Sequence, residues 1–94
     1  MVARAKDINV FKLLSDNVTR SIFHLIANER QVSYRNLLRA LNEENIPMRD
    51  ASKSLEELRE AELIEEKSAP VSDFATFYIT ANGLSLEREL RKLG

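Results

Sequence analysis

Apolar side chains recur at intervals of three and four residues along most of the chain, the spacing that places them on one face of an α-helix. A first helix is predicted around Phe11 and ends near Asp16, a residue that can cap the helix after it. The apolar stripe of that second helix consists of Val18, Ile22, Leu25 and Ile26. A third helix follows Ser33, its expected N-cap, and its apolar face consists of Tyr34, Leu37, Leu38 and Leu41.

Two further helices flank a segment whose pattern is that of a β-hairpin. Pro47 suits the first turn of the fourth helix, because a residue without an N–H loses no hydrogen bond there. The apolar face of this helix consists of Met48, Ala51, Leu55 and Leu58. Residues 63–67 and 77–79 are expected to pair as strands around a long loop at 68–75. Thr80 is the expected cap of a last helix that carries Leu84, Leu86, Leu90 and Leu93.

The composition fits one small globular domain and excludes several classes of chemistry. Of the 94 residues, 44% are hydrophobic and 31% charged, a balance from which we expect a folded protein. No segment approaches the roughly 18–20 apolar residues that a membrane crossing needs, so we expect a cytoplasmic protein. The chain has no cysteine, which excludes disulfides, thiolate metal sites and cysteine nucleophiles. Two glycines and two prolines leave few turns and favour a mainly helical fold.

The predicted order of elements is helix, helix, short strand, helix, turn, helix and hairpin, which is the order of a winged helix-turn-helix. The run FKLLSDNVTRSIFHLIANE at 11–29 resembles the opening of ArsR-type repressor domains, with Leu-Ser-Asp followed by Arg20. Residues 51–64 resemble the recognition helix and exit strand of the ArsR and MarR families. Residues 77–80 with Gly83 are similar to the second wing strand of MarR- and PadR-like proteins. The resemblance covers residues 11–83 and implies a DNA-binding transcriptional regulator.

We expect one domain that spans residues 1–94, and the resemblance assigns a role to each of its parts. It implies a recognition helix at about 47–61, a wing hairpin at about 63–79 and a C-terminal helix at about 81–93. The fold class is therefore mainly α with a small β-hairpin.

Three features depart from these families. The turn between the third and fourth helices, residues 41–46, is about three residues longer than the tight turn of the families. Glu62 occupies the position of their helix-ending glycine, so we expect this helix to close differently. The loop at 68–75 has no Lys or Arg, which argues against insertion of the wing into a minor groove.

The net charge of −1 conceals a division along the chain. Residues 1–41 carry a net charge of +4, and residues 42–94 a net charge of −5. In the docking that the resemblance implies, the N-terminal half of the recognition helix touches the base edges of duplex DNA. The residues expected to contact the DNA are Met48, Arg49, Ser52, Lys53 and, on the phosphate backbone, Arg35. Arg49 can pair with a guanine through two hydrogen bonds.

Other interpretations of these charges stay open. Arg49 and Lys53 also fit an ordinary solvated helix face, with Lys53 paired to Glu57 and Glu56 to Arg59. The acidic run from Glu56 to residue 66 fits a solvated face better than a cation site. It also suits the alternative function, in which an acidic helix and wing surface binds a protein partner.

The sequence contains no recognisable enzymatic or metal-binding pattern. His24 lies off the apolar stripe of its helix and has no evident partner ligands. The cysteines that ArsR metal sensors carry at the start of the third helix are absent from residues 32–36. No glycine-rich phosphate loop and no catalytic triad order is visible, so we expect no enzyme, metal or cofactor.

The apolar terminal helices indicate a homodimer. Both helices carry more apolar residues than each needs to cover the other. The expected interface consists of Phe11, Leu86, Leu90 and Leu93. The alternative is that these leucines pack on the first helix of the same chain.

Overall fold

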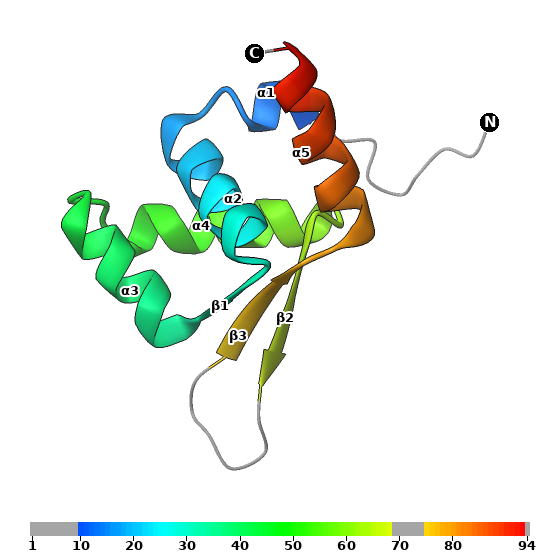
Figure 1. Cartoon of the computed structure of the whole chain (residues 1–94). Coiled ribbons are helices and arrows are strands. Elements are labelled where there is room, and N and C mark those ends of the chain that lie inside the picture. The colour runs from blue at the N-terminus through cyan, green and yellow to red at the C-terminus, as the bar shows by residue number, and fades with distance from the viewer. Residues whose placement is uncertain (1–9, 69–74, 94) are drawn as a thin grey trace.

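The computed structural model describes residues 10–68 and 75–93, with the side chain of Leu93 outside that description. Five helices and three strands follow one another along this part of the chain (Figure 1). They are α1 (Val10–Leu13), α2 (Asn17–Glu29), β1 (Gln31–Ser33), α3 (Tyr34–Glu43), α4 (Met48–Glu60), β2 (Ile64–Ser68), β3 (Ala75–Ile79) and α5 (Ala81–Leu93). The mainly α fold with a small antiparallel sheet is confirmed.

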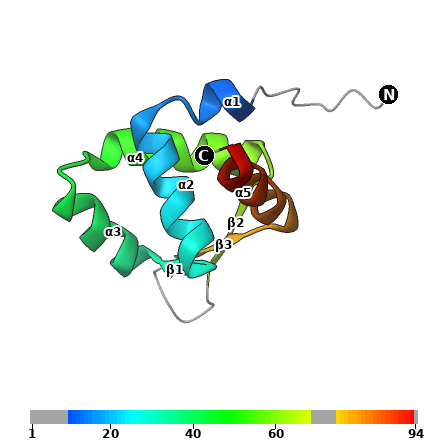
Figure 2. The ribbon, with the colours of Figure 1, turned by 45° about the horizontal axis from the view of Figure 1, so that its top comes forward.

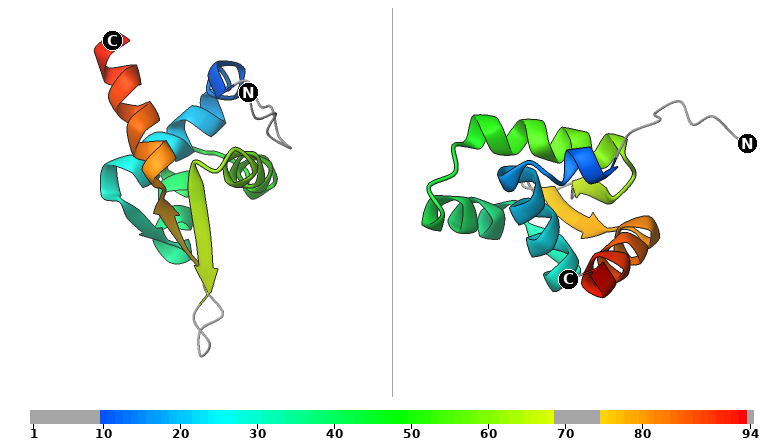
Figure 3. Two further views of the ribbon diagram at one scale, coloured as in Figure 1. Left: turned by 90° about the vertical axis from the view of Figure 1, so that its right-hand side faces the viewer. Right: turned by 90° about the horizontal axis from the view of Figure 1, so that it is seen from above.

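The sheet has the order β1-β3-β2, and both neighbours of β3 run antiparallel to it. Phe77 at the centre of β3 faces Val32 on one side and Glu66 on the other, and it is only 3% exposed. Figure 3 shows β2 and β3 extending away from the helices, as the wing of this architecture does. Beyond the expected hairpin, β1 contributes a third strand because Val32 joins the core next to Phe77.

Helix α2 is the centre of the core, between α3 and α5 and crossed by α4 (Figure 2). Phe23, absent from the expected stripe, is completely buried, whereas Val18 and Leu25 lie at the edge of the core. Compared with the predicted apolar stripe, the buried face of α2 is rotated about the helix axis toward Phe23, by roughly the angle between two consecutive residues. The buried residues of α2 are Thr19, Ile22, Phe23, Ile26 and Ala27.

Each of the three expected N-caps is confirmed by a hydrogen bond to a backbone N–H of the first turn. Asp16 Oδ2 accepts from Thr19 at 2.9 Å, Ser33 Oγ from Asn36 at 3.2 Å, and Thr80 Oγ1 from Gly83 at 2.9 Å. Each contact satisfies an N–H that has no partner inside its helix. Pro47 stands at the N-cap position of α4, one residue before the helix begins.

The prediction that α4 ends without the closure usual at a glycine is wrong. Glu62 adopts a left-handed backbone conformation with φ 62°, the conformation in which a helix-ending glycine is usual. The N–H of Leu63 donates to the Leu58 carbonyl at 3.0 Å, and that of Glu62 donates to the Arg59 carbonyl at 2.9 Å. These two bonds make a Schellman closure, and Leu58 and Leu63 are both buried beside it. A glutamate thus carries the conformational cost that a glycine would avoid.

Helix α3 ends with the same type of closure, and the turn before α4 is shorter than predicted. The helix continues to Glu43, so only residues 44–47 separate the two helices, where the sequence predicted a turn at 41–46. Asn45 has φ 58°, and the N–H of Ile46 donates to the Leu41 carbonyl at 2.9 Å. Asparagine is one of the residues that tolerate this conformation.

Candidate nucleic-acid interface

The exposed side of α4 carries the residues that the sequence assigned to DNA. Arg49, Ser52 and Lys53 are exposed in the N-terminal half of the helix. The opposite side is buried by Ala51, Ser54, Leu55 and Leu58, which anchor α4 to the rest of the core. Helical periodicity therefore groups the arginine, the serine and the lysine on one solvent-facing surface.

Met48 and Arg35 lie at the margins of this surface. Met48 is half-buried and packs against the hydrophobic core, because it occupies the same helix side as Ala51 three residues later. Its side chain supports the start of α4 more than it faces solvent. Arg35 is exposed in the first turn of α3, the helix that precedes α4 in the helix-turn-helix.

A buried polar link, which the sequence analysis missed, joins α4 to α2. The hydroxyl oxygens of Thr19 and Ser54 are 2.7 Å apart, and the residues are 1% and 3% exposed. Thr19 Oγ1 donates its hydrogen to Asp16 Oδ2 at 3.0 Å. Since a hydroxyl has one hydrogen, Ser54 donates to Thr19. The sequence contained one signal for this link, because Thr19 and Ser54 are polar residues that each lie on the apolar side of a predicted helix.

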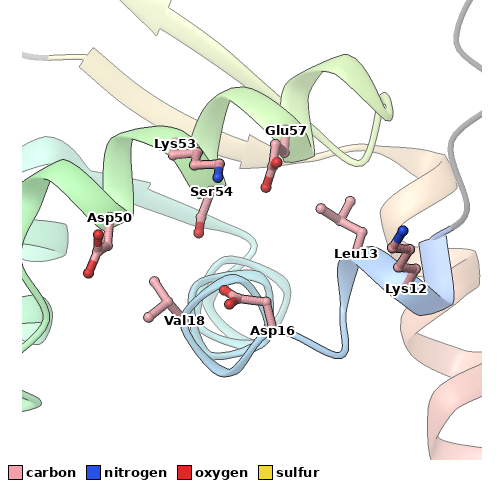
Figure 4. Close-up of a pocket in the computed structure, with 8 residues that line it drawn as sticks. All are labelled: Lys12, Leu13, Asp16, Val18, Asp50, Lys53, Ser54 and Glu57. Atoms are coloured by element: carbon pink, nitrogen blue, oxygen red, sulfur yellow. The ribbon is translucent and has the colours of Figure 1, made fainter.

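A cleft of about 580 Å³ lies between this link and the α1–α2 junction (Figure 4). Lys53 and Glu57 border the cleft from α4, Asp16 borders it from the start of α2, and Lys12 and Leu13 border it from α1. The pKa of Asp16 lies below its ordinary value, chiefly because the Thr19 backbone N–H and then the Thr19 hydroxyl donate to the carboxylate. The charge of Lys53 lowers the pKa further.

The other half of α4 and strand β2 form an acidic surface. Its exposed carboxylates belong to Glu56, Glu60, Glu62, Glu65 and Glu66. Arg59 Nη1 lies 2.6 Å from Glu66 Oε1, so this arginine pairs with the strand and not with Glu56. The pair is largely solvated, and such pairs add little stability. Lys67 lies over the ring of Tyr78, 5.1 Å from its centre.

The residues expected at a dimer interface divide into two groups. Phe11 is 62% exposed, whereas Leu86 and Leu90 are half-buried and pack against the core. The side chain of Leu93 lies outside the described residues. Phe11 and Leu90 line the same groove of about 380 Å³ between α1, α2 and α5. Packing within the chain therefore accounts for part of the apolar surface of α5, whereas the larger part of Phe11 is exposed.

Residues 10–68 and 75–93 contain no cluster of three or more metal-ligating side chains. His24 is exposed, as expected, and shares the Phe11 groove with Arg20 and Arg91. In the same part of the chain, no helix has the length and apolar character required to cross a lipid bilayer.

No protein-family model and no curated protein matches this sequence. Solved structures do match its fold. A variant of Lactococcus lactis ZitR in apo form superposes with a TM-score of 0.66 and 20% identity over 88% of this chain and 59% of that one. A second structure of the variant has a TM-score of 0.68 and 18% identity over 97% of this chain and 57% of that one.

NadR, solved in complex with 4-hydroxyphenylacetate, gives a TM-score of 0.68 at 17% identity, over 98% of this chain and 77% of that one. ZitR and NadR are MarR-family transcriptional regulators. This chain spans less than two thirds of the length of the ZitR chains. At these identities the likeness establishes the winged-helix fold.

Proposed function

We propose that this protein is a cytoplasmic winged-helix regulator of transcription that binds duplex DNA by placing α4 in the major groove. The observation that carries the proposal is the grouping of Arg49, Ser52 and Lys53 on the exposed side of the second helix of a helix-turn-helix. In such motifs the N-terminal residues of this helix contact base edges. The likeness to ZitR and NadR supports the proposal.

Each residue has a distinct role in this proposal. Arg49 reads a guanine with two hydrogen bonds, and Ser52 and Lys53 contact base edges or phosphates. Arg35 contacts the phosphate backbone from the start of α3. Met48 holds the first turn of α4 against the core, so that Arg49 is presented at a fixed angle. The protein acts by binding alone, without a catalytic residue, metal or cofactor.

The proposed protein is a homodimer that uses Phe11 together with the α5 leucines Leu86, Leu90 and Leu93. Phe11 supports this, because an exposed phenylalanine beside an apolar groove gains from burial against a second copy. A two-fold dimer presents two α4 helices to sites about one turn of DNA apart, so its operator is an inverted repeat. Light scattering tests the dimer, and a mass equal to one chain would reject it.

The DNA proposal is tested by selecting bound duplexes from a fragment library and measuring their affinity across a salt series. We expect a sequence-preferring complex that weakens as salt rises. Arg49→Ala should cost about 1–3 kcal/mol and relax the preference at one base pair, and Lys53→Ala should weaken all duplexes and reduce the salt slope by about one. Arg88→Ala, which removes the same charge from the exposed face of α5, is the matched control. Absence of a sequence-preferring complex at low salt would refute the proposal.

A second candidate function follows from the acidic surface of α4 and β2. In this alternative, the acidic helix and wing surface, with Glu56, Glu60 and Glu65, binds a basic protein partner in place of DNA. A stoichiometric partner recovered in a pull-down, and lost when Glu56 and Glu60 are both changed to Lys, would support it. Retention of that partner by the charge-reversed protein would rule out this surface.

A further inference from the structure

We propose that Asp16 sets the DNA affinity of this protein by holding Lys53 away from the DNA backbone, as an internal competitor of a phosphate. The inference rests on the proposed function, because it concerns the same lysine. It assigns a role to a residue outside the helix-turn-helix contact surface. Asp16 belongs to the N-terminus of α2, whereas Lys53 belongs to α4.

Two hydrogen bonds from Thr19 hold the Asp16 carboxylate. Its Oδ2 accepts from the backbone N–H of Thr19 at 2.9 Å and from the hydroxyl of the same residue at 3.0 Å. Thr19 is tied in turn to Ser54, the neighbour of Lys53, by the buried contact of 2.7 Å. The position of this carboxylate is therefore coupled to the part of α4 that carries the lysine.

Lys53 faces the cleft into which this carboxylate projects (Figure 4). Lys53 borders this cleft from α4, together with Ser54 and Glu57, and Asp16 borders it from the start of α2. The lowered pKa of Asp16, to which the charge of Lys53 contributes, is consistent with an attraction between the two groups. In this proposal, a lysine that reaches a DNA phosphate leaves the attraction of the Asp16 carboxylate across the cleft.

The other two carboxylates of the cleft are less suited to this role. Asp50 and Glu57 stand three residues before and four residues after Lys53 on the same helix. Pairs of this kind on a solvated helix are worth only a few tenths of a kcal/mol. They also move with α4, whereas Asp16 is anchored to another element. A carboxylate held by the N–H and the hydroxyl of Thr19 loses little entropy when it pairs with the lysine.

The experiment is a double-mutant cycle with Asp16→Asn and Lys53→Gln, measured as duplex affinity by fluorescence anisotropy. Asparagine caps helices as well as aspartate does, so the substitution removes the charge and keeps the cap. We expect Asp16→Asn to tighten DNA binding by about three- to tenfold when Lys53 is present. The salt slope should become steeper by about one released ion. With Lys53→Gln in place, the substitution should have little effect.

Glu29→Gln is the matched control, because it removes the same charge from the exposed C-terminal end of α2. It should change the affinity equally, and slightly, in both backgrounds. Equal tightening by Asp16→Asn with and without Lys53 would overturn the inference, since it would reflect general charge repulsion. Weaker binding of Asp16→Asn would overturn it as well.

A titration without DNA separates the inference from the proposed function. NMR of the Asp16 carboxyl should show its pKa rising when Lys53 is replaced by Gln, and an unchanged pKa would refute the attraction between the two groups. One outcome distinguishes the two proposals: none of the proteins binds a duplex, but the Asp16 pKa does rise. The proposed DNA binding then fails, and the competition with a phosphate fails with it. The electrostatic attraction between Lys53 and Asp16 would still be established.

Discussion

Thr19 Oγ1 and Ser54 Oγ lie 2.7 Å apart in the core and join the N-terminus of α2 to the middle of α4. The direction of the bond follows from its third member, because Thr19 donates to Asp16 and so accepts from Ser54. The helix proposed to read DNA is thus oriented by a polar contact as well as by apolar packing.

This direction predicts that the two hydroxyls are not equivalent. Thr19→Val removes the acceptor and leaves the Ser54 hydroxyl buried without a partner, at a cost of about 1–3 kcal/mol. Ser54→Ala leaves Thr19 donating to Asp16, so we expect a smaller loss of about 1 kcal/mol. Urea unfolding of both variants measures the difference.

The exposed neighbour Ser52→Ala is the control for these measurements and should unfold as the wild type does. A larger loss from Ser54→Ala than from Thr19→Val would contradict the assigned direction. The double variant should lose less than the sum of the single variants, because its second change removes a group that is already unpaired.

The backbone at Glu62 predicts a stabilising substitution. Its φ of 62° is strained for a side-chain-bearing residue, so Glu62→Gly should raise the free energy of unfolding by about 0.5–1 kcal/mol. The same change at Glu60, inside the helix, should lower it by about 1 kcal/mol. Chemical denaturation of both variants checks the pair, and a loss of stability at Glu62 would exclude strain at this closure.

Gly83 is required by a close approach between α5 and the strands. A Cβ at this position would lie 2.4 Å from the Leu63 carbonyl oxygen and 2.5 Å from Ile79 Cδ1. Gly83→Ala should therefore cost about 1–3 kcal/mol even though alanine favours helices. Thermal unfolding gives the measurement.

Ser85→Ala, an exposed position two residues further along α5, serves as the reference for Gly83. It should be neutral or slightly stabilising. If Gly83→Ala behaved in the same way, the start of α5 would have room for a side chain.

The lowered pKa of Asp16 predicts a contribution to stability that depends on pH. A carboxyl whose pKa is lower in the folded state stabilises the fold above its unfolded pKa of about 3.9, and this stability disappears as pH falls through the folded value. Acid should therefore destabilise the wild type more than Asp16→Asn. Unfolding free energies measured from neutral pH down to about pH 3 check this, with Glu29→Gln as the reference.

The helices, caps and exposed surfaces were predictable because they depend on neighbours within one turn. Asp16, Ser33 and Thr80 were recognised as caps, and Arg49, Ser52 and Lys53 as an exposed group, from spacing alone. The buried face of α2 was misplaced because Val18 and Leu25 are as apolar as the residues that the core accepts. Which residues of α2 the core takes in depends on how α4 and the sheet pack against this helix.

The sequence by itself determined that this is a mainly helical chain with a hairpin and a polar surface on its fourth helix, because these features follow from the local periodicity of apolar and polar residues. Only the tertiary structure decided that Thr19 bonds to Ser54, that Lys53 faces Asp16 across a cleft and that Glu62 takes a glycine's conformation. Each of these depends on how α4 is set against residues distant in the chain or on how its end packs, and spacing along one helix carries no information about that placement.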